Sequence, residues 1–185
     1  VHDSADLGRF IYEHFRATGW MRAMGVWGQA VGIMGLMNLA RRLGASKYRN
    51  AAILAGEYLK SLQIVNPADE RNHGGFREHT PQTPWSYPRD AATGGMGLCA
   101  LYKETGQEEY LQRAMWFAEW YHRFGSDSGG WPFSYFDFRK GRGGYTGGEV
   151  VGEEDNANRE RVKGDWQAGG GLVYWQLYKL TGENK

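Results

Sequence analysis

Apolar residues recur with the 3.6-residue period of an α-helix through most of the chain, and two kinds of helix alternate. One kind carries a single apolar stripe between polar residues, so it buries one face and leaves the other in water. The other kind is apolar around almost its whole circumference, and we expect it to be buried on all sides. The predicted outer helices span about 5–18, 47–63 and 108–124, and the predicted inner helices span about 25–43, 90–105 and 165–182.

The chain is similar to itself in two registers. Gly32–Leu36 corresponds to Gly94–Leu98, and we call this displacement the first repeat offset. Leu101–Gly106 corresponds to Leu177–Gly182 with five of those six residues identical, and we call this displacement the second repeat offset. Self-similarity of this kind indicates repeated structural units. The sequence therefore predicts an all-α fold of about three helical hairpins, each made of one outer and one inner helix.

Glycine is unusually frequent, with 28 of the 185 residues, and several glycines fall inside the predicted inner helices. Each of them costs about 1 kcal/mol of helix propensity relative to alanine. A compensating interaction is needed, and the close approach of neighbouring helices supplies one. We therefore expect the inner helices to pack tightly against their neighbours at these positions.

The connections between the predicted helices differ in length. Those from inner to outer helices are short turns, such as 44–46 and 105–107, whereas those from outer to inner helices grow to 63–89 and 125–164. The long connections should therefore gather at one rim, over the N-termini of the inner helices, where backbone N–H groups favour anionic groups. Because functional residues concentrate on loops held by a rigid scaffold, we expect the functional site at this rim.

Charge and composition exclude several classes of partner. The 22 Lys and Arg residues balance 21 Asp and Glu, so the net charge of +1 gives no general attraction to nucleic acid or to an anionic membrane. No segment has the roughly 18 uninterrupted apolar residues that a membrane span needs. The lone Cys99 forms neither an internal disulfide nor a zinc cluster. We expect a soluble protein without a metal, a cofactor, or a nucleic-acid or membrane partner.

The N-terminus lacks Met, a basic segment and an apolar segment, which is typical of a mature end or an excised fragment. The sequence therefore leaves the cellular compartment open, and both secretion and a periplasmic location are compatible with it.

Three glycine-containing motifs accompany the repeat. Leu101–Gly106 reads Leu-Tyr-Lys-Glu-Thr-Gly at the end of an inner helix, and Gly74–Phe76 and Gly129–Trp131 follow outer helices. With these motifs and its inner-helix glycines, the chain resembles the α/α-toroid proteins, especially the six-hairpin glycosidase-like superfamily. That superfamily includes unsaturated glucuronyl hydrolases, N-acylglucosamine 2-epimerases and polysaccharide lyases. The resemblance implies a carbohydrate substrate in a cleft at the long-loop rim.

A full toroid has about six hairpins, whereas this chain has three outer–inner pairs. We therefore interpret residues 1–185 as a single α/α-hairpin domain. Three arrangements stay open: a part of a larger toroid, a half that a second copy completes, or an open arc of hairpins.

The densest chemistry lies on the loop that enters the second inner helix. It mixes imidazole, guanidinium, carboxyl and aromatic groups, and sugar recognition needs this mixture because rings stack on pyranose faces while charged groups bind hydroxyls or a uronate carboxylate. Residue 90 also lies at the expected helix start, where an aspartate commonly serves as an N-cap. The candidate residues on this loop are His73, Glu78, His79, Trp85, Tyr87, Arg89 and Asp90.

Other candidates lie at corresponding levels of the repeat. Trp131 and Tyr135 belong to an aromatic segment that forms either a stacking platform or a hydrophobic cluster pinning the loop. Trp27 lies near the start of the first predicted inner helix, where its side chain either lines the cleft or is buried. Asp165, Trp166 and Gln167 begin the third inner helix, where Asp165 is either a functional carboxylate or a helix cap.

These residues support more than one chemistry. In glycoside hydrolysis, Asp90 and Asp165, with Glu78 as a substitute, would serve as the acid and the water-activating carboxylate. In lysis of a uronate polysaccharide, Tyr87 or His79 would remove the proton while Arg89 or Asn72 neutralises the uronate carboxylate. The same residues are also compatible with epimerisation of a sugar, and with a non-catalytic scaffold that binds a glycan or a protein.

Overall fold

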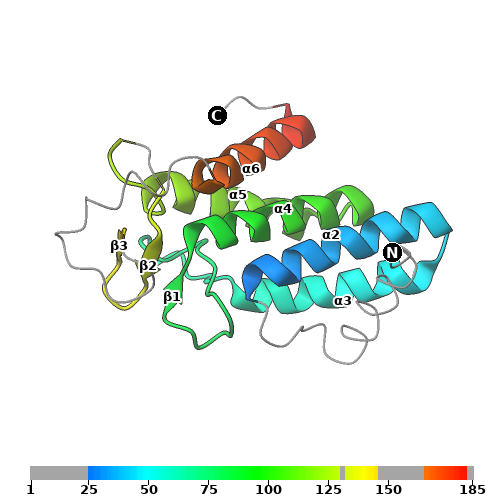
Figure 1. The fold of residues 1–185 in the computed structure, drawn as a ribbon, viewed down its shortest axis with the longest axis horizontal. Coiled ribbons are helices and arrows are strands. Elements are labelled where there is room, and N and C mark those ends of the chain that lie inside the picture. The colour runs from blue at the N-terminus through cyan, green and yellow to red at the C-terminus, as the bar shows by residue number, and fades with distance from the viewer. Residues whose placement is uncertain (1–24, 130–131, 146–164, 183–185) are drawn as a thin grey trace.

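The computed structural model describes residues 25–129, 132–145 and 165–182, except for the side chains of 165–169. This part of the chain is mostly helical, with five helices and one small antiparallel sheet (Figure 1). The predicted helix at 5–18 lies outside the described residues. The helices are α2 (Val26–Leu43), α3 (Ser46–Leu62), α4 (Pro88–Thr105), α5 (Glu108–Arg123) and α6 (Asp165–Thr181), and the strands are β1 (Trp85–Ser86), β2 (Tyr135–Asp137) and β3 (Arg142–Gly144).

The three predicted inner helices, α2, α4 and α6, end in the same way. Each is followed by a glycine in the left-handed conformation, namely Gly44, Gly106 and Gly182, with φ of 63°, 69° and 70°. The N–H of each glycine donates to the carbonyl oxygen four residues earlier. The two repeat offsets relate these caps to one another, and glycine occupies them because it adopts this conformation without steric cost.

The helices form a row with the long connections at one end. Helix α4 packs against both α2 and α6, while α3 and α5 run back beside them (Figure 1). Strand β1 belongs to the connection between α3 and α4, and β2 and β3 belong to the connection between α5 and α6. One sheet in the order β1-β2-β3 joins these connections at the end where α2 and α4 begin, which is the predicted rim.

The sheet departs from the all-α prediction. Trp85 and Ser86 of β1 pair with Asp137 and Phe136 of β2, and the other edge of β2 pairs with β3. Buried backbone groups of a long connection need hydrogen-bond partners, and strand pairing supplies them. Because these strands have two or three residues, their apolar alternation is too short to be recognised in the sequence.

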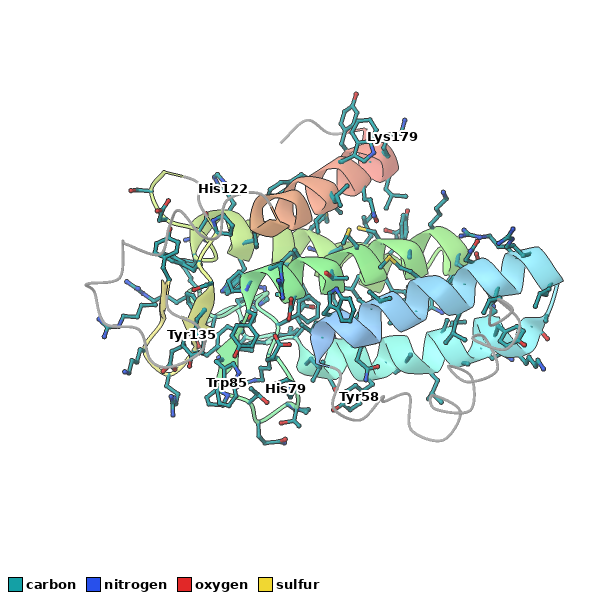
Figure 2. The ribbon with its side chains drawn as sticks, viewed as in Figure 1. Tyr58, His79, Trp85, His122, Tyr135 and Lys179 are labelled. Atoms are coloured by element: carbon teal, nitrogen blue, oxygen red, sulfur yellow. The ribbon has the colours of Figure 1, made fainter. Side chains whose placement is uncertain are left out.

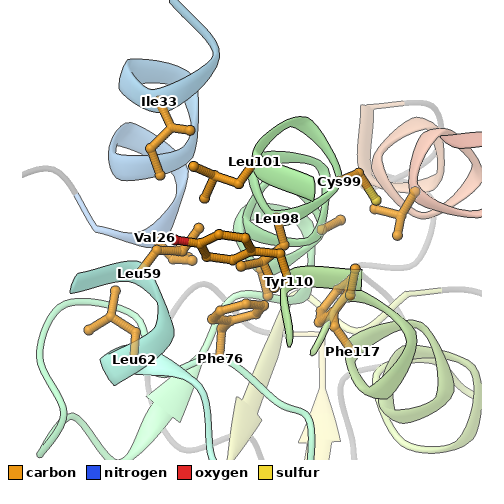
Figure 3. Close-up of a cluster of buried hydrophobic side chains, with 14 of the residues drawn as sticks. Val26, Ile33, Leu59, Leu62, Phe76, Leu98, Cys99, Leu101, Tyr110 and Phe117 are labelled. Carbon is orange, nitrogen blue, oxygen red and sulfur yellow. The ribbon is translucent and has the colours of Figure 1, made fainter. Parts of the chain in front are cut away.

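The core confirms the expected close approach at glycines (Figure 3). A Cβ atom at Gly97 of α4 would lie 3.0 Å from the Cβ of Ala30 in α2, and one at Gly94 would lie 2.8 Å from Cγ2 of Val26. Contacts this short leave no room for a side chain, so the helix propensity lost at these glycines is offset by tight interhelical packing.

Burial on all sides holds for α4 but not for its neighbours. Helix α2 exposes 46% of Trp27 and 42% of Val31, and α6 exposes several large apolar residues. The prediction was wrong for these two helices, because apolar composition around a helix does not reveal whether each flank has a neighbour. No helix in the described part of the chain combines the length and apolar character of a membrane span.

Candidate functional site

Glu78 connects the beginnings of two adjacent helices. Its carbonyl oxygen accepts a hydrogen bond from the Val26 N–H at the start of α2, with an N···O distance of 2.8 Å. Its carboxyl Oε2 accepts one from the N–H of Tyr87, immediately before α4, at 3.3 Å. Its own N–H donates to Trp85 of β1 at 3.0 Å. The carboxyl group is thus held at the rim, between the N-termini of α2 and α4.

Gly25 makes this position possible. A Cβ atom at Gly25 would collide with Oε1 of Glu78 and would lie 3.0 Å from Nδ1 of His79. A glycine immediately before α2 therefore lets the Glu78 carboxyl approach the helix start. Gly25 was not among the predicted site residues, and its only signal in the sequence was a glycine at the start of a predicted inner helix.

The Glu78 side chain is almost completely buried, with a residue exposure of 2%. Burial penalises the ionised carboxylate and raises the pKa from 4.5 to about 8, and the negative charge of Asp90 acts in the same direction. The Tyr87 N–H and the Arg89 guanidinium oppose this shift without overcoming it. Glu78 therefore holds a proton at neutral pH.

Asp90 lies in the first turn of α4, where its Oδ1 accepts a charge-assisted hydrogen bond from Nε of Arg89 at 2.8 Å. Its side chain is 15% exposed, so it is more accessible than Glu78. Helix α4 begins at Pro88 with Tyr87 as its N-cap, so the N-cap interpretation of Asp90 was wrong. Proline fits the first helical position because its fixed φ and missing N–H cost nothing there.

Tyr87 lies beside this pair of carboxyl groups and contacts a second aromatic residue. The Tyr87 ring packs edge-on to Tyr135 of β2, with 6.2 Å between ring centroids. Burial raises the pKa of Tyr87, and the charges of Glu78 and Asp90 raise it further. Figure 2 shows Trp85, His79 and Tyr135 at this same end of the helices.

Two buried polar atoms lie next to this site in the sequence. Nε1 of Trp85 and Oγ of Ser86 have no hydrogen-bond partner within the described residues. Such groups cost free energy when they stay unpaired, so they are available to a ligand or to water.

The aromatic segment before and within β2 packs inward. Tyr135 is 3% exposed, and Phe136 and Phe138 surround Trp120 of α5 at centroid distances of 5.2 and 5.9 Å. The structure favours the hydrophobic-cluster interpretation over a stacking platform for these residues. Tyr135 therefore positions Tyr87 rather than presenting a ring face to a ligand. Asp137, which the sequence analysis missed, is buried and bound by Arg139.

His73 belongs to a different surface. Its ring lies 4.9 Å from that of Trp116 in α5, and its Nδ1 accepts a hydrogen bond from the Asn66 N–H at 3.1 Å. It lines a hollow of about 200 Å³ beside α5, together with Arg123 and Phe124. Since Glu78 packs against α2 and α4 instead, the structure does not bring these two predicted residues together.

The remaining predicted residues divide into two groups. His79 is exposed beside Gly25, and Trp27 is half exposed in the first turn of α2, so the buried interpretation of Trp27 was wrong. Trp131 lies outside the described residues, as do the side chains of Asp165, Trp166 and Gln167 at the start of α6.

Comparisons with known proteins add no assignment to this geometry. No protein-family model matches the chain, and no curated protein matches it in sequence. Within the described residues, no group of three or more His, Cys, Asp or Glu side chains is placed to hold a metal ion.

Proposed function

We propose that this chain is an α/α-toroid-type hairpin protein that hydrolyses a poly- or oligosaccharide at its long-loop rim. Glu78 acts as the general acid that protonates the leaving oxygen, and Asp90 acts as the carboxylate that activates water. Arg89 holds Asp90 and supplies a cation for an acidic sugar. His79 and Trp85 lie at the same end of the helices as the pair and are the proposed contacts for the sugar.

The observation that carries this proposal is the difference in environment between two neighbouring carboxyl groups. Burial raises the pKa of Glu78 to about 8, while the more accessible carboxyl group of Asp90 pairs with Nε of Arg89 at 2.8 Å. A buried carboxyl group beside a more accessible one that pairs with a cation is the arrangement that serves as acid and base in glycoside hydrolysis. A helix-capping role alone needs no protonated glutamate.

Elimination is less well supported than hydrolysis. A lyase needs a base that loses its proton readily, and the pKa of Tyr87 is raised by burial and by the adjacent Glu78 and Asp90. Ionising Tyr87 beside these groups costs additional free energy. The protonated Glu78 is instead suited to donate a proton to a glycosidic oxygen.

We expect Glu78→Gln to abolish most of the hydrolytic activity, because glutamine keeps the shape of the side chain but cannot donate an acidic proton. The protein is incubated with neutral and uronate-containing oligosaccharides, and new reducing ends and unsaturated uronate absorbance are followed together. A general acid contributes about 10²- to 10⁴-fold, so kcat should fall by at least about a hundredfold. Asp90→Asn should cause a comparable loss.

The matched control is Glu119→Gln, an isosteric change at a side chain that is 64% exposed on α5, which should leave kcat unchanged. Full activity of Glu78→Gln would reject the acid role. A gain of unsaturation without hydrolysis would favour a lyase. Glycan binding without any product, and unaffected by Glu78→Gln or Asp90→Asn, would favour the non-catalytic scaffold.

The pH dependence of kcat gives a second test. Glu78 must be protonated to act, so kcat should fall as pH rises through about 8, about tenfold per pH unit beyond it. The rate is measured on the preferred oligosaccharide between about pH 5 and pH 10. A profile that instead rises across this alkaline range would indicate that a group other than Glu78 controls the proton transfer.

A further inference from the structure

A hollow of about 200 Å³ lies between helix α5 and the connection that follows α3. Residues from both sides line it, among them Pro67, His73, Trp116, Arg123 and Phe124. Its whole lining belongs to the part of the chain that the structure describes, and neither carboxyl group of the proposed acid–base pair contributes to it. Its volume is below the about 300 Å³ at which sites for drug-sized ligands begin, so it suits a single small ring rather than an extended chain.

The wall that the connection provides is fixed against α5. Gly74 approaches the α5 backbone so closely that an added Cβ atom would collide with the carbonyl of Trp116. The N–H of His73 donates to the Asp69 carbonyl at 2.9 Å, and the N–H of Gly74 donates to the Ile64 carbonyl at 2.8 Å. The hollow is therefore preformed, which lowers the entropy cost of ordering it around a ligand.

Hydrogen bonding fixes the position of the proton on the His73 ring. Nδ1 of His73 accepts a hydrogen bond from the Asn66 N–H at 3.1 Å, so this nitrogen carries no proton. The proton of the neutral ring therefore lies on Nε2, which becomes a hydrogen-bond donor. Within the described residues, no acceptor binds this N–H. The connection thus presents one unpaired donor at the hollow.

Trp116 provides a second donor and a flat surface on the α5 side. Its ring lies 4.9 Å from that of His73, with an angle of 55° between the ring planes. Its indole N–H has no acceptor in the described part of the chain, whereas that of Trp120 donates to the Arg71 carbonyl at 3.1 Å. Two unpaired N–H groups beside aromatic rings suit a ligand that has both oxygen acceptors and an apolar face.

The cation at the hollow is already neutralised. The guanidinium of Arg123 donates to one carboxylate on each wall at 3.2 Å, and Glu70 supplies the carboxylate on the connection. The same guanidinium lies 4.9 Å from the centroid of the Phe124 ring. Because Arg123 has these partners, the hollow offers an anionic ligand no net attraction. The oxygen acceptors of the ligand are therefore expected to be uncharged.

We propose that this hollow binds one neutral sugar residue of a polysaccharide, separately from the carboxyl pair. The hydroxyl oxygens of a pyranose accept hydrogen bonds from the two unpaired N–H groups, and the C–H groups on its face pack against the aromatic rings. Hydroxyl groups also donate, so they can bind the remaining lone pairs of Glu70. The choice of a sugar rests on the proposed function, whereas the binding itself needs neither Glu78 nor Asp90.

Saturation-transfer NMR with the methyl glycosides of glucose, galactose, mannose and xylose tests this proposal in the millimolar range. At least one of these neutral probes should bind the wild-type protein. His73→Phe and Trp116→Phe keep an aromatic ring but each remove one N–H donor, so each should weaken binding about threefold to tenfold. His122→Phe is the matched control, because His122 is an exposed histidine of α5 that does not line the hollow, and it should bind like the wild type.

The same measurement on Glu78→Gln separates this proposal from the proposed hydrolysis. Glu78→Gln should bind the glycosides like the wild type, whatever its activity. Hydrolysis by the wild type without glycoside binding, or equal binding by the wild type and both ring variants, would reject the hollow as a sugar site. Stronger binding of glucuronate or of methylammonium than of every neutral glycoside would overturn the choice of an uncharged ligand. Glycoside binding without any hydrolysis would leave this site standing and count against the proposed function alone.

Discussion

Glu78→Gln is expected to make the protein much less sensitive to pH between about 4.5 and about 8. The wild-type protein should lose stability as pH rises through this range, and the variant should lose much less. Glu78 is protonated in the folded state up to about pH 8, whereas in the unfolded chain it ionises near 4.5. A carboxyl whose folded pKa is raised contributes stability that is full below the unfolded pKa and is lost as pH rises through the folded one. Glutamine has no such proton to lose.

The expected effect is large because the shift spans several pH units. Within this window the free energy of unfolding should fall by up to about 1.4 kcal/mol per pH unit through this one group. Urea denaturation at a series of pH values measures it. The variant should match the wild type near the acid end and exceed its stability by several kcal/mol above pH 8.

Glu119→Gln again serves as the control, since its side chain is exposed and its curve should follow the wild type. If Glu78→Gln and the wild type lose stability in parallel across the window, Glu78 is ionised in the folded protein. The proposed general acid would then lack its proton, so this result would also remove the basis of the proposed function.

The helices could be predicted from the sequence because they depend on local periodicity and end signals. The bounds of α2 to α6 agree with the predicted ranges within two residues. Pro88 and the glycines Gly44 and Gly106 mark helix ends through their own backbone preferences. The two repeat offsets also relate the left-handed glycines that follow α2, α4 and α6.

The sheet and the partner of each helix flank could not be predicted, because both depend on contacts between distant segments. Strand β1 pairs with β2 although α4 and α5 separate them in the sequence. Exposure of Trp175 likewise depends on which neighbours α6 has rather than on its own composition. Periodicity describes a helix but does not describe its surroundings.

The candidate site shows the same division. Its loop was found from residue types alone, and Tyr87, Arg89 and Asp90 lie together because they are adjacent in sequence. The prominence of Glu78 depends on burial against Gly25 and on a hydrogen bond from Tyr87, which only the folded chain supplies. The sequence therefore placed Glu78 behind Asp90 as a candidate, whereas in the folded chain burial raises the pKa of Glu78 to about 8.

Gly74→Ala is expected to destabilise the protein by about 3 kcal/mol or more. Gly74 has a φ of +91°, a conformation that alanine adopts only with strain, and an added methyl group would collide with the backbone carbonyl of Trp116 in α5. A side chain could rotate away from such a contact, but a helix backbone cannot. The residue is also fixed from both sides, since its N–H donates to Ile64 at 2.8 Å and its carbonyl accepts from Gln63 at 3.0 Å.

The same substitution at Gly171 should have the opposite sign. Gly171 lies inside α6 with no atom near the added methyl group, so Gly171→Ala should stabilise the helix by up to about 1 kcal/mol. Both variants are compared with the wild type by urea denaturation. Gly74→Ala with wild-type stability would mean that the connection can move away from α5. Because this connection leads from α3 to Glu78, such freedom would contradict the rigid placement of the carboxyl between α2 and α4 on which the site depends.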